Sequence, residues 1–368
     1  MEGTHGGNIY RAAEQLGLPG SEIIDFSASI NPLGIPKKVL AGIKDALRYI
    51  DNYPDPDAKQ LTLTLARHFA IDSESIICGN GSTELIYLVI RALMPERILI
   101  PAPTFSEYER AAGSSREIVR YALNARDNFA VHPDSFITAM AGGSNSQSHR
   151  MAVPTSVDMV FLCNPNNPTG GILRKSDMLT IAAAARDLKC YLVVDEAFID
   201  FSPEDSLINE VEENPYLIVL RSMTKFYALS GLRVGYGVFP LKLIDTIKQH
   251  KEPWTVNTLA QAAGIAALDD VSYKEDTFRI MRNEKKTLED GFRLLKIPFL
   301  PAAANFYLIQ LDRAQEIIGA LEEKGVLIRD CSNFRGLDGH GGPYARVAVK
   351  ANRDNMRLLK ELAQLCKA

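Results

Sequence analysis

The sequence predicts an α/β protein whose larger part is a mostly parallel β-sheet covered by helices on both faces. Three short apolar runs have the length of buried strands, and helical runs separate them. These strand-like runs are 159–163, 191–194 and 215–220, and the clearest helix between them is the Ala-rich run 176–188. Strands that alternate with helices form parallel sheets with helices on both sides, so the pattern predicts that architecture.

A change of sequence texture after Pro240 predicts a second, smaller α+β domain. Long charged helical segments are expected at 242–251, 258–268 and about 272–295. Strand-like runs follow, with a helix between the first two, at 305–311, 326–329 and 345–349. We therefore expect a large domain over 31–250, a small one over 251–368, and an N-terminal arm, residues 1–30, that joins the small domain.

The N-terminal part of the chain is predicted to contain two helices and two loops. Apolar spacing predicts one helix at 9–16, ended by Gly17, and another from about 59 to 69. Between these helices, a short strand at 23–30 runs into a turn at Asn31, and 51–57 is a proline-rich loop.

A glycine turn between a strand and a helix predicts an anion-binding site. The strand-like run 76–79 leads to Gly81, and a helical run continues from Ser82 and Thr83 to Leu93. The free backbone N–H groups and positive dipole end of such a helix attract anions. The two hydroxyl groups add further hydrogen-bond donors.

Two further stretches precede the central strands. The strand-like run 97–102 leads to Phe105 and Tyr108, an aromatic pair that either stacks on a flat ligand ring or packs in the core. The polar stretch 142–150 has no hydrophobic periodicity, and we interpret it as a surface insertion rather than a domain linker.

Composition narrows the classes of partner. The formal net charge of -4 gives no reason to expect nucleic acid or an anionic membrane, so an anionic ligand must be bound by local clusters. The five cysteines form no C-x-x-C pair, which favours buried free thiols over disulfides or a metal site. Neither a signal-peptide pattern nor an apolar run of about 18 residues is present, so we expect a cytoplasmic protein.

Lys225 is the residue around which the functional hypothesis is built. It lies in a run of small, hydroxylated and apolar residues after the strand 215–220, and Arg233 follows it. Taken alone, such a lysine is more often a solvated surface residue. Upstream, however, Asp195 closes an apolar strand and Asn167 begins an Asn-Pro-Thr-Gly turn. Together with the anion site, these residues predict a pyridoxal 5′-phosphate (PLP) site, which needs a lysine amine, a carboxylate for the pyridine nitrogen and phosphate anchors.

With these motifs in place, the chain resembles the fold-type I, aspartate-aminotransferase-like PLP enzymes over essentially its whole length. The resemblance implies that Lys225 bonds to the cofactor, that Asp195 pairs with its pyridine nitrogen, and that Asn167 hydrogen-bonds its ring O3′. It implies a stacking ring from Phe105, and a phosphate cup made of Gly81, Ser82, Thr83, Ser222 and Arg233. Tyr53 matches the tyrosine that reaches the phosphate of the partner subunit's cofactor, which implies a homodimer with shared active sites.

Within this family, the chain looks most like the L-threonine O-3-phosphate decarboxylases of cobalamin biosynthesis. The features that favour this branch are the His5-Gly6-Gly7-Asn8 start with the run 25–34, the run 329–338, and Phe198 where aminotransferases usually have a tyrosine. The implied reaction is decarboxylation of L-threonine O-3-phosphate to (R)-1-amino-2-propanol O-2-phosphate. The implied substrate-binding residues are His5, Asn31, Arg329 and Arg346, and which arginine meets the phosphate and which the carboxylate stays open.

Two other classes stay open. The neighbouring branch is that of the histidinol-phosphate aminotransferases, which differ in leaving the cofactor as pyridoxamine phosphate. The second is a PLP-binding regulatory module fused to a DNA-binding domain. The acidic charge and the lack of a winged-helix segment in the sequence disfavour this class.

Overall fold

The structure is a computed structural model in which residues 5–143, 156–337 and 344–366 are described. Within these residues, the larger sheet has seven strands in the order β2-β8-β7-β6-β5-β3-β4. The pairs from β4 through β3, β5 and β6 to β7 are parallel, whereas β8 runs antiparallel to β2 and β7. The strands are β2 (Ile76–Gly79), β3 (Arg97–Ala102), β4 (Glu117–Ala122), β5 (Met159–Cys163), β6 (Tyr191–Asp195), β7 (Leu217–Ser222) and β8 (Gly235–Val238). The predicted mostly parallel sheet is confirmed.

Helices cover both faces of this sheet. Successive residues of a strand point to opposite sides, and both sides carry apolar side chains that helices bury. In β7, Leu217 and Val219 belong to one apolar cluster and Ile218 and Leu220 to another. The first cluster includes side chains of α3 (Lys59–Phe69), α6 (Pro133–Met140), α7 (Lys175–Asp187) and α9 (Thr258–Leu268). The second includes side chains of α4 (Gly81–Leu93), α5 (Glu107–Ala112) and α8 (Leu241–Gln249).

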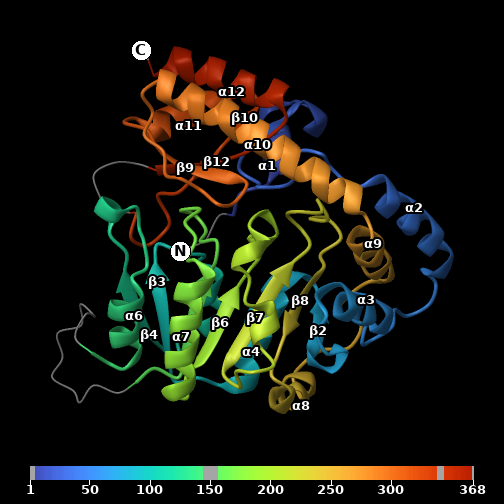
Figure 1. Cartoon of the computed structure of the whole chain (residues 1–368). Helices are drawn as coiled ribbons and strands as arrows, with labels where there is room; N and C mark the ends of the chain where they lie inside the picture. The colour runs from blue at the N-terminus through green and yellow to red at the C-terminus, as the bar shows by residue number, and fades with distance from the viewer. Residues whose placement is uncertain (1–4, 144–155, 338–343, 367–368) are drawn as a thin grey trace.

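A smaller unit lies beyond the carboxyl ends of the parallel strands (Figure 1). Its antiparallel sheet has the order β11-β12-β9, and the N-terminal strand β1 pairs with β10 beside it. Its own apolar core includes Phe26, Leu288 and Tyr307. The elements are β1 (Ile24–Asp25), β9 (Phe306–Gln310), β10 (Val326–Leu327), β11 (Arg329–Asp330), β12 (Tyr344–Ala348), α10 (Val271–Leu294), α11 (Ala314–Glu322) and α12 (Asn352–Leu365).

Helix α10 joins the two units. Tyr273, in its first turn, packs in the core of the large sheet, whereas Met281 and Leu288 pack in the core of the small unit. Helix α9 also packs in the large-sheet core, and there it faces α2 (Lys37–Ala46). We therefore propose that the two units meet within α10 rather than at residue 250.

Several elements begin and end where the sequence pattern predicted them, namely α1 (Ile9–Leu16), α3, β5 and α9. The edge strand β4 was not predicted: Glu117 and Arg120 interrupt its apolar residues, and only the Tyr121 side chain is buried. The predicted strand 326–329 is divided between two sheets, since β10 pairs with β1 and β11 with β12. The predicted insertion at 142–150 lies mostly outside the described residues.

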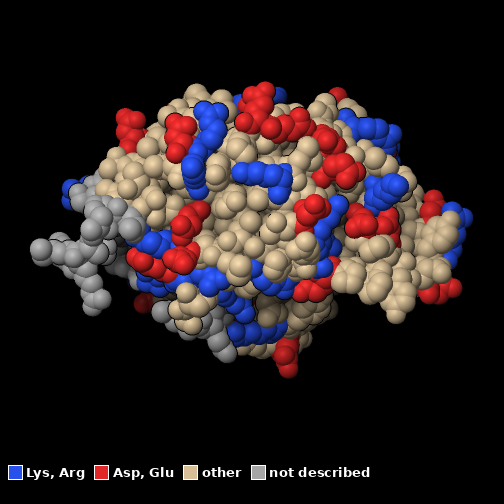
Figure 2. Space-filling model, turned by 90° about the horizontal axis from the view of Figure 1, so that it is seen from below, with Lys and Arg blue, Asp and Glu red and all other residues tan. Residues whose placement is uncertain are grey.

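The remaining features bear on partners. On the face seen in Figure 2, acidic and basic side chains are interspersed. No described helix combines the length and the apolar character needed to cross a bilayer. The described part of the chain holds no group of three or more metal-ligating side chains. All five cysteines are free thiols, as predicted. Cys78, Cys163, Cys190 and Cys331 are buried, whereas Cys366 is exposed and departs from the prediction.

Candidate active site

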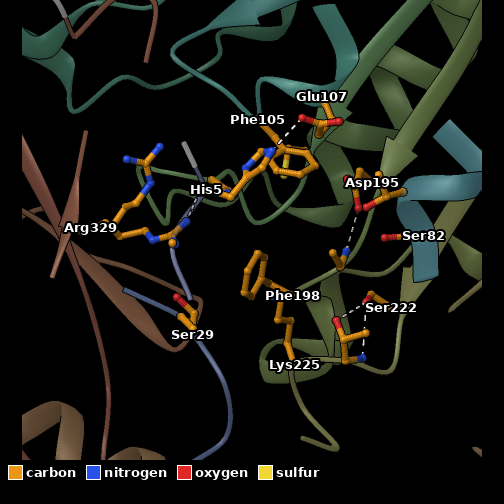
Figure 3. Close-up of a pocket in the computed structure, with 18 of the residues that line it drawn as sticks. His5, Ser29, Ser82, Phe105, Glu107, Asp195, Phe198, Ser222, Lys225 and Arg329 are labelled. Atoms are coloured by element: carbon orange, nitrogen blue, oxygen red, sulfur yellow. Dashed lines mark hydrogen bonds and ion pairs between the residues drawn. The ribbon is translucent and has the colours of Figure 1, made fainter. Parts of the chain in front are cut away.

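A cavity of about 420 Å³ lies where the carboxyl ends of β5, β6 and β7 meet the small unit and the N-terminal segment (Figure 3). Loops at this end of a parallel sheet are the usual location of ligand sites in α/β proteins. The cavity brings together most of the residues predicted from the sequence, which are His5, Ser82, Thr83, Phe105, Asn167, Asp195, Ser222, Lys225, Arg233, Arg329 and Arg346.

Lys225 extends into this cavity from the loop that follows β7, and most of its surface is enclosed. Burial, with the positive charges of Arg346 and Arg233, lowers the pKa of its amine from 10.5 to about 8. A lysine with this pKa carries a larger neutral fraction near pH 7 than a solvated one. The neutral amine is the form that can attack a carbonyl carbon.

Asp195, the last residue of β6, presents a buried carboxylate to the same cavity. Its Oδ2 accepts a hydrogen bond from the Tyr108 hydroxyl at 2.8 Å, and its Oδ1 accepts one from the Ala197 N–H at 3.0 Å. Burial raises the pKa of this carboxyl to about 6, although both hydrogen bonds favour the ionised form. The two hydrogen bonds fix the orientation of the Asp195 carboxylate.

Small residues and Arg233 form an anion cup at the start of α4. Gly81 has a φ of +76°, and a Cβ there would lie 2.5 Å from Nη2 of Arg233. A Cβ on Gly235 would lie 2.5 Å from the backbone nitrogen of Ser82. Both glycines are therefore needed for this close packing, which brings the guanidinium against the first turn of the helix. Burial lowers the pKa of Arg233.

Ser222 lines the same cavity as the anion cup. Its Oγ lies 2.7 Å from Oγ1 of Thr224, a cavity-lining residue that the sequence analysis did not single out. The cavity thus combines hydroxyl groups with the backbone donors at the start of α4, and such a set can bind phosphate through hydrogen bonds as well as charge.

Arg329 and Arg346 lie directly opposite each other on the antiparallel strands β11 and β12. Both side chains are buried and line the cavity. Among the described residues, no carboxylate lies within ion-pair distance of either guanidinium. Their hydrogen bonds go instead to neutral oxygens: Arg329 donates to Asn333 and Asp330 O, and Arg346 to Asn167 and to Ser27 O at 2.9 Å.

This arrangement is electrostatically unfavourable for the protein alone, because like charges on directly opposed residues of a strand pair repel. Burial lowers the pKa of Arg346 to about 10, and Nε of the same side chain has no hydrogen-bond partner among the described residues. The pair is therefore suited to an anionic ligand, which would supply the charge that the protein does not.

The loop that contains Ser29 and Asn31 presents a different residue to the cavity from the one predicted. Asn31 was expected to bind substrate, but it is not among the cavity-lining residues. Its Nδ2 donates to Phe226 O at 2.8 Å and Thr277 Oγ1 at 2.7 Å, and its Oδ1 accepts from Leu33 N at 3.1 Å. The amide of Asn31 is thus used to fasten this loop to the protein. Ser29 lines the cavity instead, with a buried hydroxyl that has no described partner.

His5 and Phe105 close one side of the cavity (Figure 3). Nε2 of His5 lies 2.8 Å from Oε1 of Glu107, whose Oε2 accepts a hydrogen bond from the Tyr87 hydroxyl at 2.8 Å. The rings of His5 and Phe105 lie 6.0 Å apart between centroids. The N-terminal segment is thereby held against the cavity by a buried carboxylate that the sequence pattern did not reveal.

Tyr53 does not reach the cavity of its own chain. Its side chain is 83% exposed and packs at 5.0 Å, between ring centroids, against Trp254.

The sequence left open whether Tyr108 stacks on a ligand ring or packs in the core. Its ring stacks on Phe161 in the core, while its hydroxyl donates a hydrogen bond to Asp195. No sequence pattern revealed this contact, which joins residues 87 positions apart.

A lysine of lowered pKa, a fixed buried carboxylate and an anion cup at the carboxyl ends of parallel strands define an α/β enzyme pocket for a phosphorylated, carbonyl-bearing ligand. The chain belongs to the aminotransferase class I and II family, whose model matches residues 21–364.

Individual members of this family are similar along the whole chain. The threonine-phosphate decarboxylase of Salmonella typhimurium is 38% identical over 366 residues, which covers 98% of this chain and 95% of that protein. Among solved structures, the histidinol-phosphate aminotransferase from Clostridium acetobutylicum superposes with a TM-score of 0.83 at 29% identity, over 94% of this chain and 99% of that one. The L-threonine-O-3-phosphate decarboxylase from Porphyromonas gingivalis gives 0.78 at 26% identity, over 94% and 100%.

The pKa of Lys225 generates a prediction about stability. Between pH 8 and 10.5, the unfolded chain holds a proton at this amine that the folded chain does not, so the unfolding free energy rises with pH across that window. In the cofactor-free protein, Lys225→Met is expected to raise the unfolding free energy at pH 7 by about 1–3 kcal/mol. The gain should shrink above pH 8, as urea denaturation at several pH values will measure. The same substitution at exposed Lys248 is the control, and a gain that does not change with pH would contradict the assignment.

The contacts of Asn31 generate a second prediction. Asn31→Ala leaves the Thr277 hydroxyl and the Leu33 N–H without this partner and removes one of two donors to Phe226 O, so the unfolding free energy should fall by about 1–3 kcal/mol. Ser29→Ala, two positions earlier, removes a hydroxyl with no described partner and should change it by less than about 1 kcal/mol. Urea denaturation of both variants makes the comparison. Equal losses would mean that Asn31 has no special structural role.

Proposed function

We propose that this protein is a PLP-dependent lyase that decarboxylates L-threonine O-3-phosphate to (R)-1-amino-2-propanol O-2-phosphate. The observation that carries the proposal is the opposed pair Arg329 and Arg346, buried without a carboxylate partner among the described residues, in the same cavity as Lys225. A substrate with a carboxylate and a phosphate offers each arginine an anion. Bidentate, permanently charged hydrogen bonds suit arginine to both groups.

The residues of the cavity fit PLP. Gly81 and Gly235, where a Cβ would collide with Arg233 and with Ser82 N, allow the close packing of the anion cup, which matches the cofactor phosphate in charge and hydrogen bonding. Asn167 accepts from Arg346 through Oδ1, so its amide nitrogen is the group that remains to donate to the ring O3′. Phe105 offers an aromatic face, and Asp195 a carboxylate for the ring nitrogen. When bound, PLP supplies the electron sink that allows carbon dioxide to leave an amino acid.

Lys225 and Asp195 have complementary roles in this proposal. Because the pKa of Lys225 is lowered, its amine is partly neutral, which is the form that would bond to the cofactor aldehyde with loss of water. Once free and protonated, the same amine would be the group placed to return a proton to the substrate Cα. Asp195 would keep the ring nitrogen protonated, because an ionised carboxylate and a protonated nitrogen in contact stabilise each other. This attraction would oppose the effect of burial, which alone favours the neutral carboxyl. Tyr108 and Ala197 hold its two oxygens for this contact.

The arginines decide which bond breaks. Only the bond held perpendicular to the cofactor ring delivers its electrons to the ring system. Anchoring of the substrate phosphate and carboxylate at two fixed guanidinium groups sets the rotation about Cα, so the Cα–carboxylate bond can take that orientation. Ser29, with its unpartnered hydroxyl, is a further donor to the bound anion.

Two observations favour decarboxylation over transamination. The chain is 38% identical to the Salmonella typhimurium decarboxylase, whereas the histidinol-phosphate aminotransferases found by the same sequence comparison are 29–31% identical. Phe198 also lines the cavity, packed edge-to-face on Phe306 at 5.0 Å between centroids. It offers no hydroxyl where the resemblance expects an aminotransferase tyrosine.

The proposal is tested by steady-state kinetics on purified protein with PLP. L-threonine O-3-phosphate should release carbon dioxide, and free threonine should have a kcat/KM at least about 100-fold lower, since it leaves a buried arginine without its anion. Borohydride reduction followed by peptide mapping should place the phosphopyridoxyl label on Lys225.

Transamination, the competing reaction, is assayed on the same purified protein. Faster turnover of histidinol phosphate with 2-oxoglutarate, with accumulation of pyridoxamine phosphate when the oxo acid is withheld, would replace the decarboxylase by an aminotransferase. A label on another lysine would end the assignment of Lys225, whichever substrate is preferred.

We also propose a homodimer in which Tyr53 reaches the cofactor phosphate of the partner subunit. In support, Tyr53 is exposed beside further exposed apolar side chains of the same stretch, Leu47, Tyr49 and Ile50, which a second chain would bury. Sedimentation equilibrium should give the mass of two chains. Tyr53→Phe should weaken PLP binding several-fold without changing that mass, because one hydrogen bond to phosphate is lost. A monomer with full PLP affinity would refute this proposal.

A further inference from the structure

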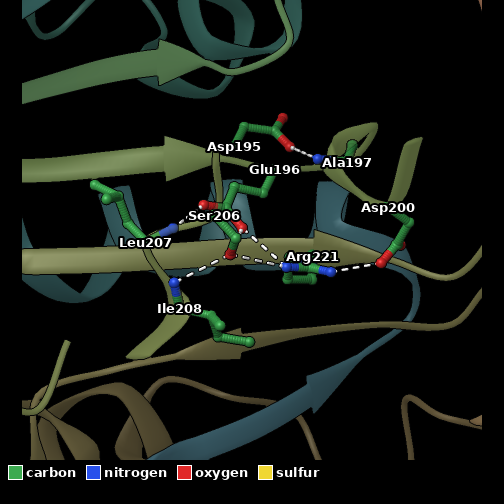
Figure 4. A network of polar contacts seen from close by, with 8 residues as sticks. All are labelled: Asp195, Glu196, Ala197, Asp200, Ser206, Leu207, Ile208 and Arg221. Carbon is green, nitrogen blue, oxygen red and sulfur yellow. Dashed lines mark hydrogen bonds and ion pairs between the residues drawn. The ribbon is translucent and has the colours of Figure 1, made fainter. Parts of the chain in front are cut away.

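A buried ionic network lies behind the cavity, on the opposite side of the strand ends that carry its polar groups (Figure 4). At its centre is Arg221, whose side chain is 3% exposed. Its Nη1 donates to Oε2 of Glu196 at 3.0 Å, and its Nη2 donates to Oδ1 of Asp200 at 2.5 Å. The guanidinium also lies over the ring of Phe69, 5.1 Å from its centroid.

The network joins the two strands that form the catalytic edge. Asp195 and Glu196 are successive residues, so when one faces the cavity the other points behind it, and the same holds for Ser222 and Arg221. Strands β6 and β7 are paired here, with Glu196 N donating to Leu220 O at 2.8 Å. The ion pair therefore adds a side-chain link between the same two strand ends, next to the groups that face the cavity.

The second arm of Arg221 reaches the loop that follows β6. Asp200 lies just beyond Ala197, whose N–H holds Asp195, and Phe198, which lines the cavity. By fixing Asp200, Arg221 fixes the far end of this short loop. One planar side chain thus contacts the residue next to Asp195 and the loop that carries Phe198.

Both carboxylate oxygens of Glu196 accept hydrogen bonds within this network. Besides Arg221, its Oε2 accepts from the Ser206 hydroxyl at 2.7 Å and its Oε1 accepts from Leu207 N at 2.7 Å. Buried ion pairs are seldom better for stability than apolar residues of the same size, because desolvation offsets the attraction. What the ion pair provides, and apolar packing does not, is direction: two rigid, charged hydrogen bonds to two different segments.

We propose that Arg221 is a positioning residue, which sets the separation of Asp195 from Lys225 and holds Phe198 against the cavity by fastening Glu196 and Asp200. This inference rests on the proposed function, because its consequence is the alignment of PLP between Asp195 and Lys225. Lysine could keep the charge at this position but could not span both carboxylates with a planar pair of donors.

Arg221→Lys is the decisive variant, compared with Arg174→Lys. Arg174 binds Asp205 at 3.0 Å, on the same loop region, but is 69% exposed and touches no strand end of the cavity. For Arg221→Lys we expect kcat to fall about 100-fold, as misplacement of about 1 Å can cause, with KM changed less than about threefold. The visible circular dichroism of bound PLP should shift, since it reports the orientation of the ring. Arg174→Lys should match the wild type in all three.

A second variant covers the case in which Arg221→Lys does not fold. Asp200→Asn keeps the shape of the partly exposed side chain and removes one ionic link, so it should lower kcat by a smaller factor, about tenfold, with the same spectral shift. If kcat per bound PLP and the circular dichroism stay at wild-type values while only thermal stability falls, Arg221 is merely structural and the inference is overturned.

The two proposals can fail separately. If wild-type protein does not decarboxylate L-threonine O-3-phosphate, the proposed function fails, and the spectral comparison of the variants still tests Arg221. Hydrogen exchange on the cofactor-free protein gives an independent measure: Arg221→Lys should speed exchange in peptides 196–208 and 217–225, and Arg174→Lys should leave 217–225 unchanged. Unchanged exchange in both peptides of Arg221→Lys would count against a positioning role.

Discussion

The enclosure of several positive charges in one cavity is the constraint on which the rest of this structure depends. Burial lowers the pKa of Lys225, and the positive charges of Arg346 and Arg233 lower it further. Arg329 adds a further charge directly opposite Arg346. Neutral oxygens, such as Ser27 O, satisfy these side chains without neutralising them. Repulsion of this kind is tolerated only if the backbone that carries the charges is rigid, and two separate apolar cores supply that rigidity.

The alternation of side chains along β6 and β7 lets one pair of strands serve two purposes. The residues that face the cavity carry the reactive groups, and their neighbours point into a buried network that holds the strand ends together. Parallel strands also deliver Asn167, Asp195 and Ser222 to one edge of the sheet. The small unit lies over this edge (Figure 1). It contributes the opposed arginines Arg329 and Arg346 to the cavity.

Most of the candidate site residues were predicted from local sequence motifs. The lysine, the strand-ending aspartate and the glycine turn each have a chemical reason to occur where they do, and the structure brings them to one cavity; their roles in binding PLP stay a prediction. What sequence alone could not give depends on contacts between distant segments. Asn31 and Ser29 lie in one loop, and only the fold decides which of them faces the cavity.

The same limit applies to cross-strand register. Nothing in the sequence states that Arg329 and Arg346 stand opposite each other, or that Tyr108 reaches Asp195, because both facts arise from pairing and packing across the fold. The buried pair of Glu196 and Arg221 was hidden for a related reason: charged residues at the ends of apolar strands resemble ordinary strand boundaries.

The pairing of β1 with β10 has a consequence for the order of events during synthesis. Phe26 N donates to Leu327 O at 2.7 Å, and Ala348 N donates to Phe26 O at 2.9 Å, so the segment that carries Ser27 and Ser29 is anchored by strands near the other end of the chain. Domains generally fold as they leave the ribosome, and the large sheet is complete once β8 has emerged. The segment that carries Ser27 and Ser29 therefore cannot dock until β10 and β12 have been made, about 300 residues later in the chain. The cavity is completed only by strands that are synthesised after the whole large sheet.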